Sequence, residues 1–338
     1  MIRKSLVAAA LLAAFAGHAQ AQETTILFNS FIHPKNLFNT DVVNPWLADI
    51  TKATEGRVKF EVPPTSLAAP QQQYDGVNKG VMDAAYMMHG FLADRVKLSQ
   101  VAHLPLSSTT PRGNSVALWR TYEKFFAKSD EYKDVQVLSL FAGPPGQIFA
   151  MKEAPQSLND LKGVKWYAMP GTTARLFEMA GAAVVAQPAV RSHEVISGGT
   201  VDGFAGYAVM DAAAFHTLQY AKTVVEVPGF LPPPSFVMFV NKKKWASIPQ
   251  RDRDIIVKMS GEEFGKRMAV YDPAGLKAKV DAQAKGVKFV QASAAFVAAL
   301  KSLAGPLEQG WLDDAQKLGV DGKAALAFYR AESQKNAK

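Results

Sequence analysis

Segments with the patterns of β-strands and α-helices alternate along the chain, and this alternation constrains the fold more than any other feature. Val58–Val62 alternates apolar with polar residues, as in a half-buried strand, and Gln71–Gly80 has helical character. After Gly143–Gly146 the same order restarts, with a strand over Val164–Ala168 and a helix over Thr172–Ala180. Alternating strands and helices favour an α/β fold with largely parallel sheets.

Two breaks rich in proline and glycine divide this pattern. Because proline cannot continue a central strand, Gly143–Gly146 and Pro232–Pro234 are expected to carry the chain from one lobe to another. Pro249–Ala284 follows as a long helical stretch, in which Pro273 predicts a kink or a break. A chain that crosses repeatedly between two lobes forms a hinge with a cleft, where small ligands usually bind. We expect a first lobe at 22–144 plus 233–272, and a second at 145–232 plus 273–338 that includes the C-terminal helices.

The N-terminus has the three parts of a secretory signal peptide. Met1–Lys4 is basic, Ser5–Gly17 is largely apolar, and Ala19 and Ala21 are small residues before a cleavage site expected after Ala21. The apolar part is shorter than the ~20 residues needed to span a bilayer, although a retained membrane anchor is the alternative. The chain has no cysteine, which excludes a disulfide framework and lipid attachment through cysteine. These features predict an exported protein of a bacterial periplasm.

Composition and charge narrow the possible partners. With 48% hydrophobic and 20% charged residues, the chain can build a true core. Loss of Arg3 and Lys4 with the signal peptide lowers the formal charge from +8 to +6. The basic residues are scattered, and the run Lys242–Lys244 is typical of a solvated strand exit, so no nucleic-acid partner is expected.

A search for catalytic signatures finds nothing that requires an enzyme. The sequence lacks Gly-x-Ser-x-Gly, His-Glu-x-x-His, a Walker loop and an early Gly-x-Gly-x-x-Gly. Its histidines do not have metal-ligand spacing. His193-Glu194 and Glu262-Glu263 are interpreted as exposed helix positions. We therefore expect neither an enzyme nor a bound metal or cofactor.

Aromatic and sulfur-containing residues gather where the expected strands end, which is the edge that faces the ligand crevice in open α/β sheets. The alternative is that they are ordinary core residues. Tyr167, Tyr207, Trp166 and His89 are the stronger site candidates, because a buried OH or NH needs a hydrogen-bond partner. The patterns Gly80–Ala84 and Gly199–Gly203 also match one another, through either duplication or coincidence.

Ser157–Lys165 resembles the s-l-x-D-L-K-G-x-K signature of the periplasmic solute receptors of tripartite ATP-independent (TRAP) transporters. Glu55–Val58, with Gly80 to Asp83, and Glu194 to Gly203 fall at the places expected for that family. The resemblance covers nearly the whole mature chain. It implies a two-lobed periplasmic-binding-protein fold with crossover strands and a long C-terminal helical region. It also implies a receptor that closes on a solute and passes it to membrane permease subunits driven by an ion gradient. We expect this receptor to be a monomer.

The departures from the family pattern concern the ligand. The arginine that most members use to hold a carboxylate falls at Tyr167, and a second, less widespread one falls near Gln147. Phe204-Ala205-Gly206 replaces the Glu-Asn common after Asp-Gly. A dicarboxylate or sialic acid is therefore not expected.

We expect instead an organic acid with an aromatic or apolar body. The residues expected to enclose that body are Trp166, Tyr167, Phe204 and Tyr207 from one lobe and Phe31, Met87 and Met88 from the other. Its acidic end is expected at Tyr167, Gln147, His33 or His89. A small sulfonate or neutral solute is the alternative ligand. A receptor of an ABC importer is the second class, and an exported enzyme is the third.

Overall fold

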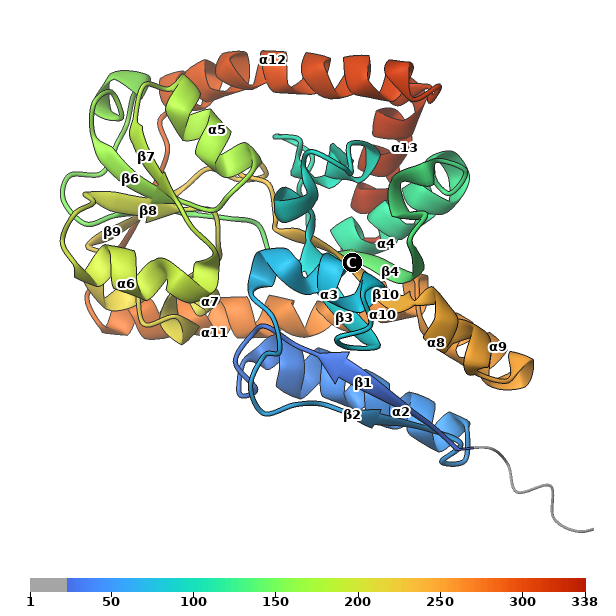
Figure 1. The fold of residues 1–338 in the computed structure, drawn as a ribbon. Helices are drawn as coiled ribbons and strands as arrows, with labels where there is room; N and C mark the ends of the chain where they lie inside the picture. The colour runs from blue at the N-terminus through green and yellow to red at the C-terminus, as the bar shows by residue number, and fades with distance from the viewer. Residues whose placement is uncertain (1–22) are drawn as a thin grey trace, which may run out of the picture.

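The computed structural model describes residues 23–338, which form two α/β lobes (Figure 1). The signal peptide predicted over 1–21 lies outside these residues. The first lobe is built on a five-stranded sheet of order β2-β1-β3-β10-β4. Its strands are β1 (Thr24–Asn29), β2 (Val58–Glu61), β3 (Ala84–Met88), β4 (Val135–Ala142) and β10 (Ser235–Asn241).

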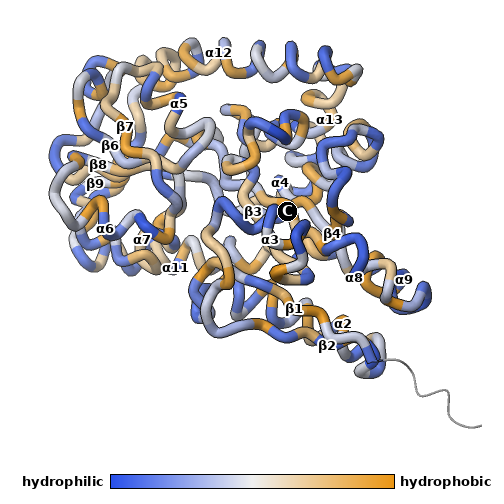
Figure 2. The backbone as a smooth tube through the Cα atoms, in the orientation of Figure 1, coloured by the Kyte–Doolittle hydropathy of each residue, from blue (hydrophilic) through white to orange (hydrophobic). Residues whose placement is uncertain are grey.

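The second lobe is built on a six-stranded sheet of order β11-β9-β5-β8-β6-β7. Its strands are β5 (Ile148–Ala150), β6 (Lys165–Ala168), β7 (Ala183–Ala186), β8 (Gly203–Ala205), β9 (Thr223–Glu226) and β11 (Lys288–Gln291). The strands at the centre of both lobes are mostly hydrophobic, whereas the outer turns are more hydrophilic (Figure 2).

Both proline-rich breaks lie where the chain passes between the sheets, as expected. Gly143–Gly146 joins β4 to β5, and Pro232–Pro234 joins β9 to β10. Strand β1 is parallel to β2 and β3, and β6 is parallel to β7 and β8. The strands that follow the crossovers run the other way: β5 is antiparallel to β8 and β9, and β10 is antiparallel to β3 and β4. Each sheet is therefore mixed, because each accepts one strand from the returning chain.

Helices cover the sheets and link the lobes (Figure 1). Those before the second crossover are α2 (Asn44–Ala53), α3 (Gln73–Asn78), α4 (Pro111–Thr121), α5 (Thr172–Met179), α6 (Ser192–Ser197) and α7 (Val209–Ala214). Those after it are α8 (Lys242–Ser247), α9 (Gln250–Met259), α10 (Glu262–Arg267), α11 (Tyr271–Ala284), α12 (Ala294–Lys317) and α13 (Gly322–Lys335). A π-helical segment, η1 (Phe38–Val43), precedes α2.

The long helical stretch expected over Pro249–Ala284 is divided into separate helices, and the disruption expected at Pro273 is a break just before it, where a 3-10 turn (Met268–Val270) leads into α11. Pro273 lies in the first turn of α11, where a residue without an N–H is tolerated. The chain turns earlier, at Gly261, whose φ is +55°. A Cβ atom there would lie 2.4 Å from the Trp119 ring, so glycine satisfies both the backbone angle and the packing.

The C-terminal helices connect the two lobes. The first half of α12 belongs to the second lobe, where Phe296 and Leu300 pack in a cluster with Trp166. Near its other end, the Trp311 indole N–H donates to the backbone oxygens of Lys97 and Leu98, each at 3.1 Å. Helix α13 then packs along α4 of the first lobe. The lobe boundaries remain a prediction, and this packing places the end of the 273–338 segment on the first-lobe core.

The two lobes repeat one local arrangement. The orders β2-β1-β3 and β7-β6-β8 are equivalent, and the helix before the third strand ends near a glycine with positive φ in each lobe, +77° at Gly80 and +66° at Gly199. The Asp83 N–H donates to the Leu27 oxygen at 3.0 Å, and the Asp202 N–H donates to the Lys165 oxygen at 2.8 Å. The similar sequence patterns therefore form the same junction between the first and third strands.

Candidate functional site

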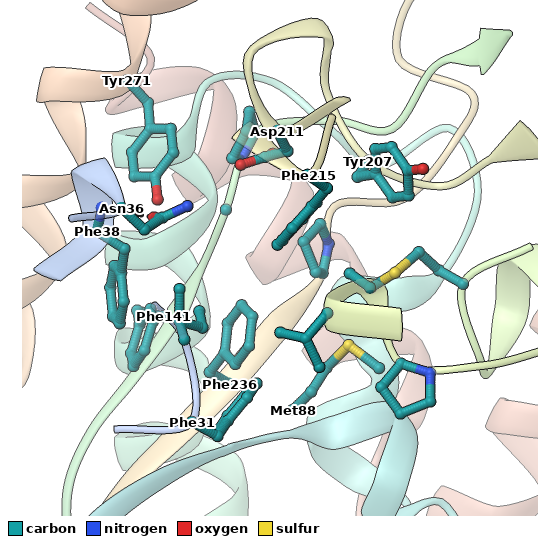
Figure 3. A pocket seen from close by; sticks show the side chains of 18 of the residues that line it. Phe31, Asn36, Phe38, Met88, Phe141, Tyr207, Asp211, Phe215, Phe236 and Tyr271 are labelled. Carbon is teal, nitrogen blue, oxygen red and sulfur yellow. Dashed lines mark hydrogen bonds between the residues drawn. The ribbon is translucent and has the colours of Figure 1, made fainter. Parts of the chain in front are cut away.

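A cavity of about 70 Å³ lies between the two lobes, several times the space that one water molecule needs. Both sheets contribute to its walls, together with the segment that leads into α11 (Figure 3). Most of the side chains are aromatic or apolar, among them Phe31, Phe38, Met88, Phe91, Phe141, Met169, Phe215, Phe236 and Met268. The polar ones are Asn36, Tyr207, Asp211 and Tyr271.

The first lobe forms an aromatic wall. Phe141 on β4 stacks on Phe38 and on Phe236 of β10, with ring centroids 5.2 Å apart in both pairs and interplanar angles of 19° and 14°. Phe31, just after β1, lies against Tyr86 at 5.0 Å. Stacked rings of this kind suit a flat or apolar solute, and their mutual packing keeps the wall in place without a ligand.

The second lobe contributes Tyr207, Met169, Pro188–Val190 and residues of α7. The Tyr207 side chain is buried, and its hydroxyl hydrogen-bonds the Thr217 hydroxyl at 3.1 Å. Burial raises the pKa of Tyr207, so the phenol stays protonated at neutral pH. Tyr207 therefore presents a ring to the cavity while its polar end is satisfied inside the lobe.

Asp211, in the first turn of α7, is the only charged residue among the described residues that line the cavity. Burial raises the pKa of its carboxyl to about 6, and a hydrogen bond from the Ala208 backbone opposes that rise. Burial, with the Asp211 charge as a smaller cause, raises the pKa of Tyr271. In Figure 3 Asp211, Tyr271 and Asn36 lie at one end of the cavity, beyond the stacked rings of Phe38, Phe141 and Phe236.

Of the residues expected in the site, Phe31, Met88 and Tyr207 line this cavity. Met87 and Trp166 lie away from it because successive strand residues point to opposite faces of a sheet. Met87 belongs to a first-lobe core cluster that Met88 does not join, and Trp166 packs on Phe177 with ring centroids 5.1 Å apart.

Tyr167 and Phe204 lie behind the second-lobe wall. The buried Tyr167 hydroxyl donates to the Gln187 backbone oxygen at 2.7 Å. Gln187 immediately precedes Pro188–Val190, so Tyr167 supports the segment that faces the cavity. Phe204 stacks on Phe149 with centroids 4.5 Å apart and interplanar angle 9°.

His89 lies in a buried hydrogen-bond chain within the first lobe. Its Nδ1 bonds the Ser235 hydroxyl at 2.8 Å, and its Nε2 bonds the Tyr132 hydroxyl at 2.9 Å. The Ser235 hydroxyl also bonds His103 Nε2 at 2.8 Å. Burial lowers the pKa of both imidazoles, to about 4 for His103, so they are neutral at pH 7. With both ring nitrogens occupied, His89 offers no group for a solute in this arrangement.

The other two expected acid-binding residues also lie outside the cavity. His33 borders a separate surface pocket with Pro63 and Pro64. The Gln147 backbone is held by two hydrogen bonds. Its oxygen accepts from the Gly206 N–H at 3.2 Å, and its N–H donates to the Tyr207 oxygen at 3.0 Å. The polar positions expected from the family pattern are therefore not the polar positions of this cavity.

Several cavity residues were not expected from the sequence: Asn36, Phe38, Phe141, Asp211, Phe215, Phe236 and Tyr271. Phe141 and Phe236 could have been found, since each sits on a strand next to a proline-rich crossover. Asp211 and Tyr271 had no such signal, because each stands in an ordinary helical pattern and meets the other only in the folded chain.

Within residues 23–338, no cluster of His, Asp and Glu side chains has the arrangement of a metal site. In the same part of the chain, no helix combines the length and apolar character that a membrane span requires.

The cleft lies between two mixed α/β lobes that are joined by several crossovers, and its lining is mostly aromatic. This arrangement defines a two-lobed solute-binding protein. Residues 28–312 match the family model "DctP: Bacterial extracellular solute-binding protein, family 7". The chain belongs to this family. The TRAP resemblance and the fold expected from it are therefore confirmed.

Individual relatives agree with this assignment. A TRAP periplasmic solute-binding protein of Bordetella bronchiseptica, solved with bound (R)- and (S)-mandelate, is 30% identical with a TM-score of 0.88, over 92% of this chain and 99% of that one. A TRAP solute-binding protein of Rhodoferax ferrireducens, solved with copurified benzoate, is 26% identical with a TM-score of 0.84, over 93% and 98%. The chain is also 51% identical, over 99% of both chains, to a Comamonas testosteroni protein named "Outer membrane transporter protein TsaT".

Proposed function

We propose that this chain is the periplasmic receptor that captures a small organic acid with an aromatic or apolar body and delivers it to a TRAP permease. In this proposal the chain is exported with cleavage after Ala21, acts as a monomer and catalyses no reaction. The observation that carries the ligand class is the wall of stacked rings formed by Phe38, Phe141 and Phe236. The mandelate and benzoate bound by the two solved relatives support the same class.

Binding would act by shifting the balance between open and closed forms. A solute in the cavity contacts Phe236 on one side and Tyr207 on the other, which come from different sheets. Because both contacts exist together only when the lobes are close, the solute favours the closed form by its difference in affinity for the two forms. The closed receptor would then present a surface that the permease recognises.

A thermal-shift panel on the mature chain tests this function. The panel contains aromatic and aliphatic monocarboxylates, dicarboxylates, sulfonates, sugars and neutral aromatics. A ligand at 100 times its Kd stabilises the native state by ~2.7 kcal/mol, which raises the Tm by several degrees. We expect a selective shift with aromatic monocarboxylates, whereas a selective shift with dicarboxylates or sugars would contradict the proposal.

Two matched variants locate the binding site. Phe236→Ala removes a half-buried ring from the cavity wall, and Phe60→Ala removes a half-buried ring that packs on Trp46 outside the cavity. We expect Phe236→Ala to abolish or strongly reduce the shift and Phe60→Ala to retain it. An equal loss in both variants would show that the aromatic wall is not the binding surface.

A further inference from the structure

The charges around the cavity do not match a bare anion. Asp211 brings a carboxyl to the lining, and none of the described lining residues is Lys, Arg or His. Tyr167 stands at the position of the family arginine, and its hydroxyl donates its hydrogen to the Gln187 backbone oxygen. An organic anion that enters this space therefore meets a carboxyl group without a cation to offset it.

We propose that the solute anion binds together with one proton, which is shared between its acid group and the Asp211 carboxyl. This inference rests on the proposed function and adds the identity of the polar partner. Two carboxyl groups held close together do not both ionise, because their repulsion favours a state in which one of them keeps a proton. The protonated member donates a hydrogen bond to the ionised one, so the pair replaces the arginine–carboxylate contact of other family members.

The neighbours of Asp211 leave it able to take that proton. Tyr207, which precedes α7, and Tyr271, at the start of α11, are the titratable groups that face it across the cavity, and both remain neutral phenols near pH 7. Asp41 of η1 and Asp272 of α11 add negative charge near Tyr271 rather than a positive counter-charge.

The cations of α11 and the arginine before α6 are paired elsewhere, and Lys35, which precedes the lining residue Asn36, is exposed and does not line the cavity. On α11, which packs against α7, Lys277 bonds Asp281 and Lys279 bonds Glu226, each at 2.6 Å. Arg191 pairs with Glu194 at 3.1 Å on the exposed side of α6. His216 follows α7 at its other end and is exposed.

Two neutral groups can complete the contact with the acid. The Asn36 side-chain oxygen accepts from the Phe38 backbone N–H at 2.9 Å, which leaves its amide nitrogen as a donor. Asn36 and the Tyr271 hydroxyl lie beside Asp211 in Figure 3. They supply hydrogen bonds without charge, so the charge balance still depends on the proton.

The inference predicts a pH dependence with a definite sign. With the pKa of Asp211 raised to about 6 by burial, its protonated fraction falls about tenfold for each pH unit above that value. An aromatic carboxylic acid has a pKa of ~4 and stays anionic throughout this range. The apparent affinity for the anion should therefore decrease roughly 50-fold from pH 6 to pH 8, in proportion to the competent fraction of the receptor.

Calorimetric titration of the mature protein with benzoate, and with mandelate as a second acid, measures this directly. At pH 7.5, titrations in buffers of different protonation enthalpy should report the uptake of about one proton per bound anion. Asp211→Asn keeps the size of the side chain and supplies an amide donor with no proton to gain. This variant should bind benzoate with little dependence on pH and more tightly than the wild type at pH 8.

Asp272→Asn is the matched control, because Asp272 is an exposed carboxyl on the facing helix whose pKa is also raised by partial desolvation, and it does not line the cavity. It should keep the wild-type pH dependence and proton uptake. A change in Asp272→Asn as large as in Asp211→Asn would overturn the assignment to Asp211.

The remaining outcomes separate the two proposals. Binding of benzoate with equal affinity at pH 6 and 8 and no proton uptake would overturn the shared proton but keep the acid receptor. Tighter binding of benzyl alcohol than of benzoate at every pH would indicate that Asp211 accepts from a neutral solute, which also overturns it. If neither acid binds at either pH, the acid-receptor function fails and the shared proton fails with it.

Discussion

The two lobes share a topology but contribute different chemistry to the cavity. The first lobe supplies stacked rings from β4, β10 and η1, with Phe141 fully buried at their centre. The second lobe supplies Tyr207 and Asp211 from the turn after β8 and the first turn of α7. The equivalent order of strands therefore determines the positions of the two walls. The residues at the strand ends and in the turns determine what each wall can bind.

The two walls also differ in how they are held in place and in where their polar groups lie. The rings of the first lobe are part of its hydrophobic core, so that wall is stabilised by the same packing that folds the sheet. The polar groups of the second lobe lie at the edge of its core, where Asp211 is half-buried. Substitutions in the two walls should therefore have separable effects on stability and on binding.

The largest effect is expected from Phe141→Ala. Removing a fully buried phenylalanine should lower the free energy of unfolding by ~3–5 kcal/mol, measured by urea denaturation, and should also weaken binding of the aromatic acid. Phe149→Ala is the matched variant in the second lobe, since Phe149 is also fully buried and stacks on Phe204 outside the cavity. It should lose similar stability and keep its affinity; equal losses of affinity would contradict the separation of the walls.

A smaller effect is expected at the junction that the lobes share. The position held by Ala84 in the first lobe is Gly203 in the second, where a Cβ atom would lie 2.3 Å from the Trp166 ring. Gly203→Ala should therefore lower the free energy of unfolding by ~1–3 kcal/mol through overpacking. The reciprocal Ala84→Gly should cost only ~0.5–1 kcal/mol through backbone entropy. Equal costs in urea denaturation would mean that Trp166 does not explain the glycine.

The smallest effect is expected from Tyr167→Phe. The lost hydrogen bond to the Gln187 oxygen should cost ~0.5–1.5 kcal/mol of stability, measured by urea denaturation. Because the hydroxyl points to the backbone behind the wall, the affinity for the solute should change only slightly. A loss of affinity of about tenfold or more, which corresponds to ~1.4 kcal/mol, would instead indicate direct contact between this hydroxyl and the solute.

The fold was largely predictable because its signals are local. The alternation of strands and helices identified both α/β lobes, and Pro232–Pro234 located a crossover. The short strands β5, β9 and β11 were not assigned from the sequence, because a run of three or four residues carries little periodicity. The helix boundaries within Pro249–Ala284 depended on Trp119 packing at Gly261, a contact that no local pattern reports.

The site was predictable in kind but not in detail. Strand ends rich in aromatic residues indicated an aromatic cleft, and Phe31, Met88 and Tyr207 line it. For the pairs Met87–Met88 and Trp166–Tyr167, the sequence did not indicate which side of the sheet each residue faces. A strand with both faces buried has apolar side chains on each of them, so its sequence does not indicate which face borders the cavity.

By itself, the sequence determined the family, the two-lobed α/β fold and the places where the chain crosses between lobes, because glycine, proline and hydrophobic periodicity act on neighbouring residues. Only the tertiary structure decided the chemistry of the cavity. It brought Phe38 against Phe141 and Phe236, and it set Asp211 facing Tyr271 with no lining cation among the described residues. The physical reason is distance along the chain: burial, stacking and the pKa of a carboxyl depend on groups that folding alone brings together.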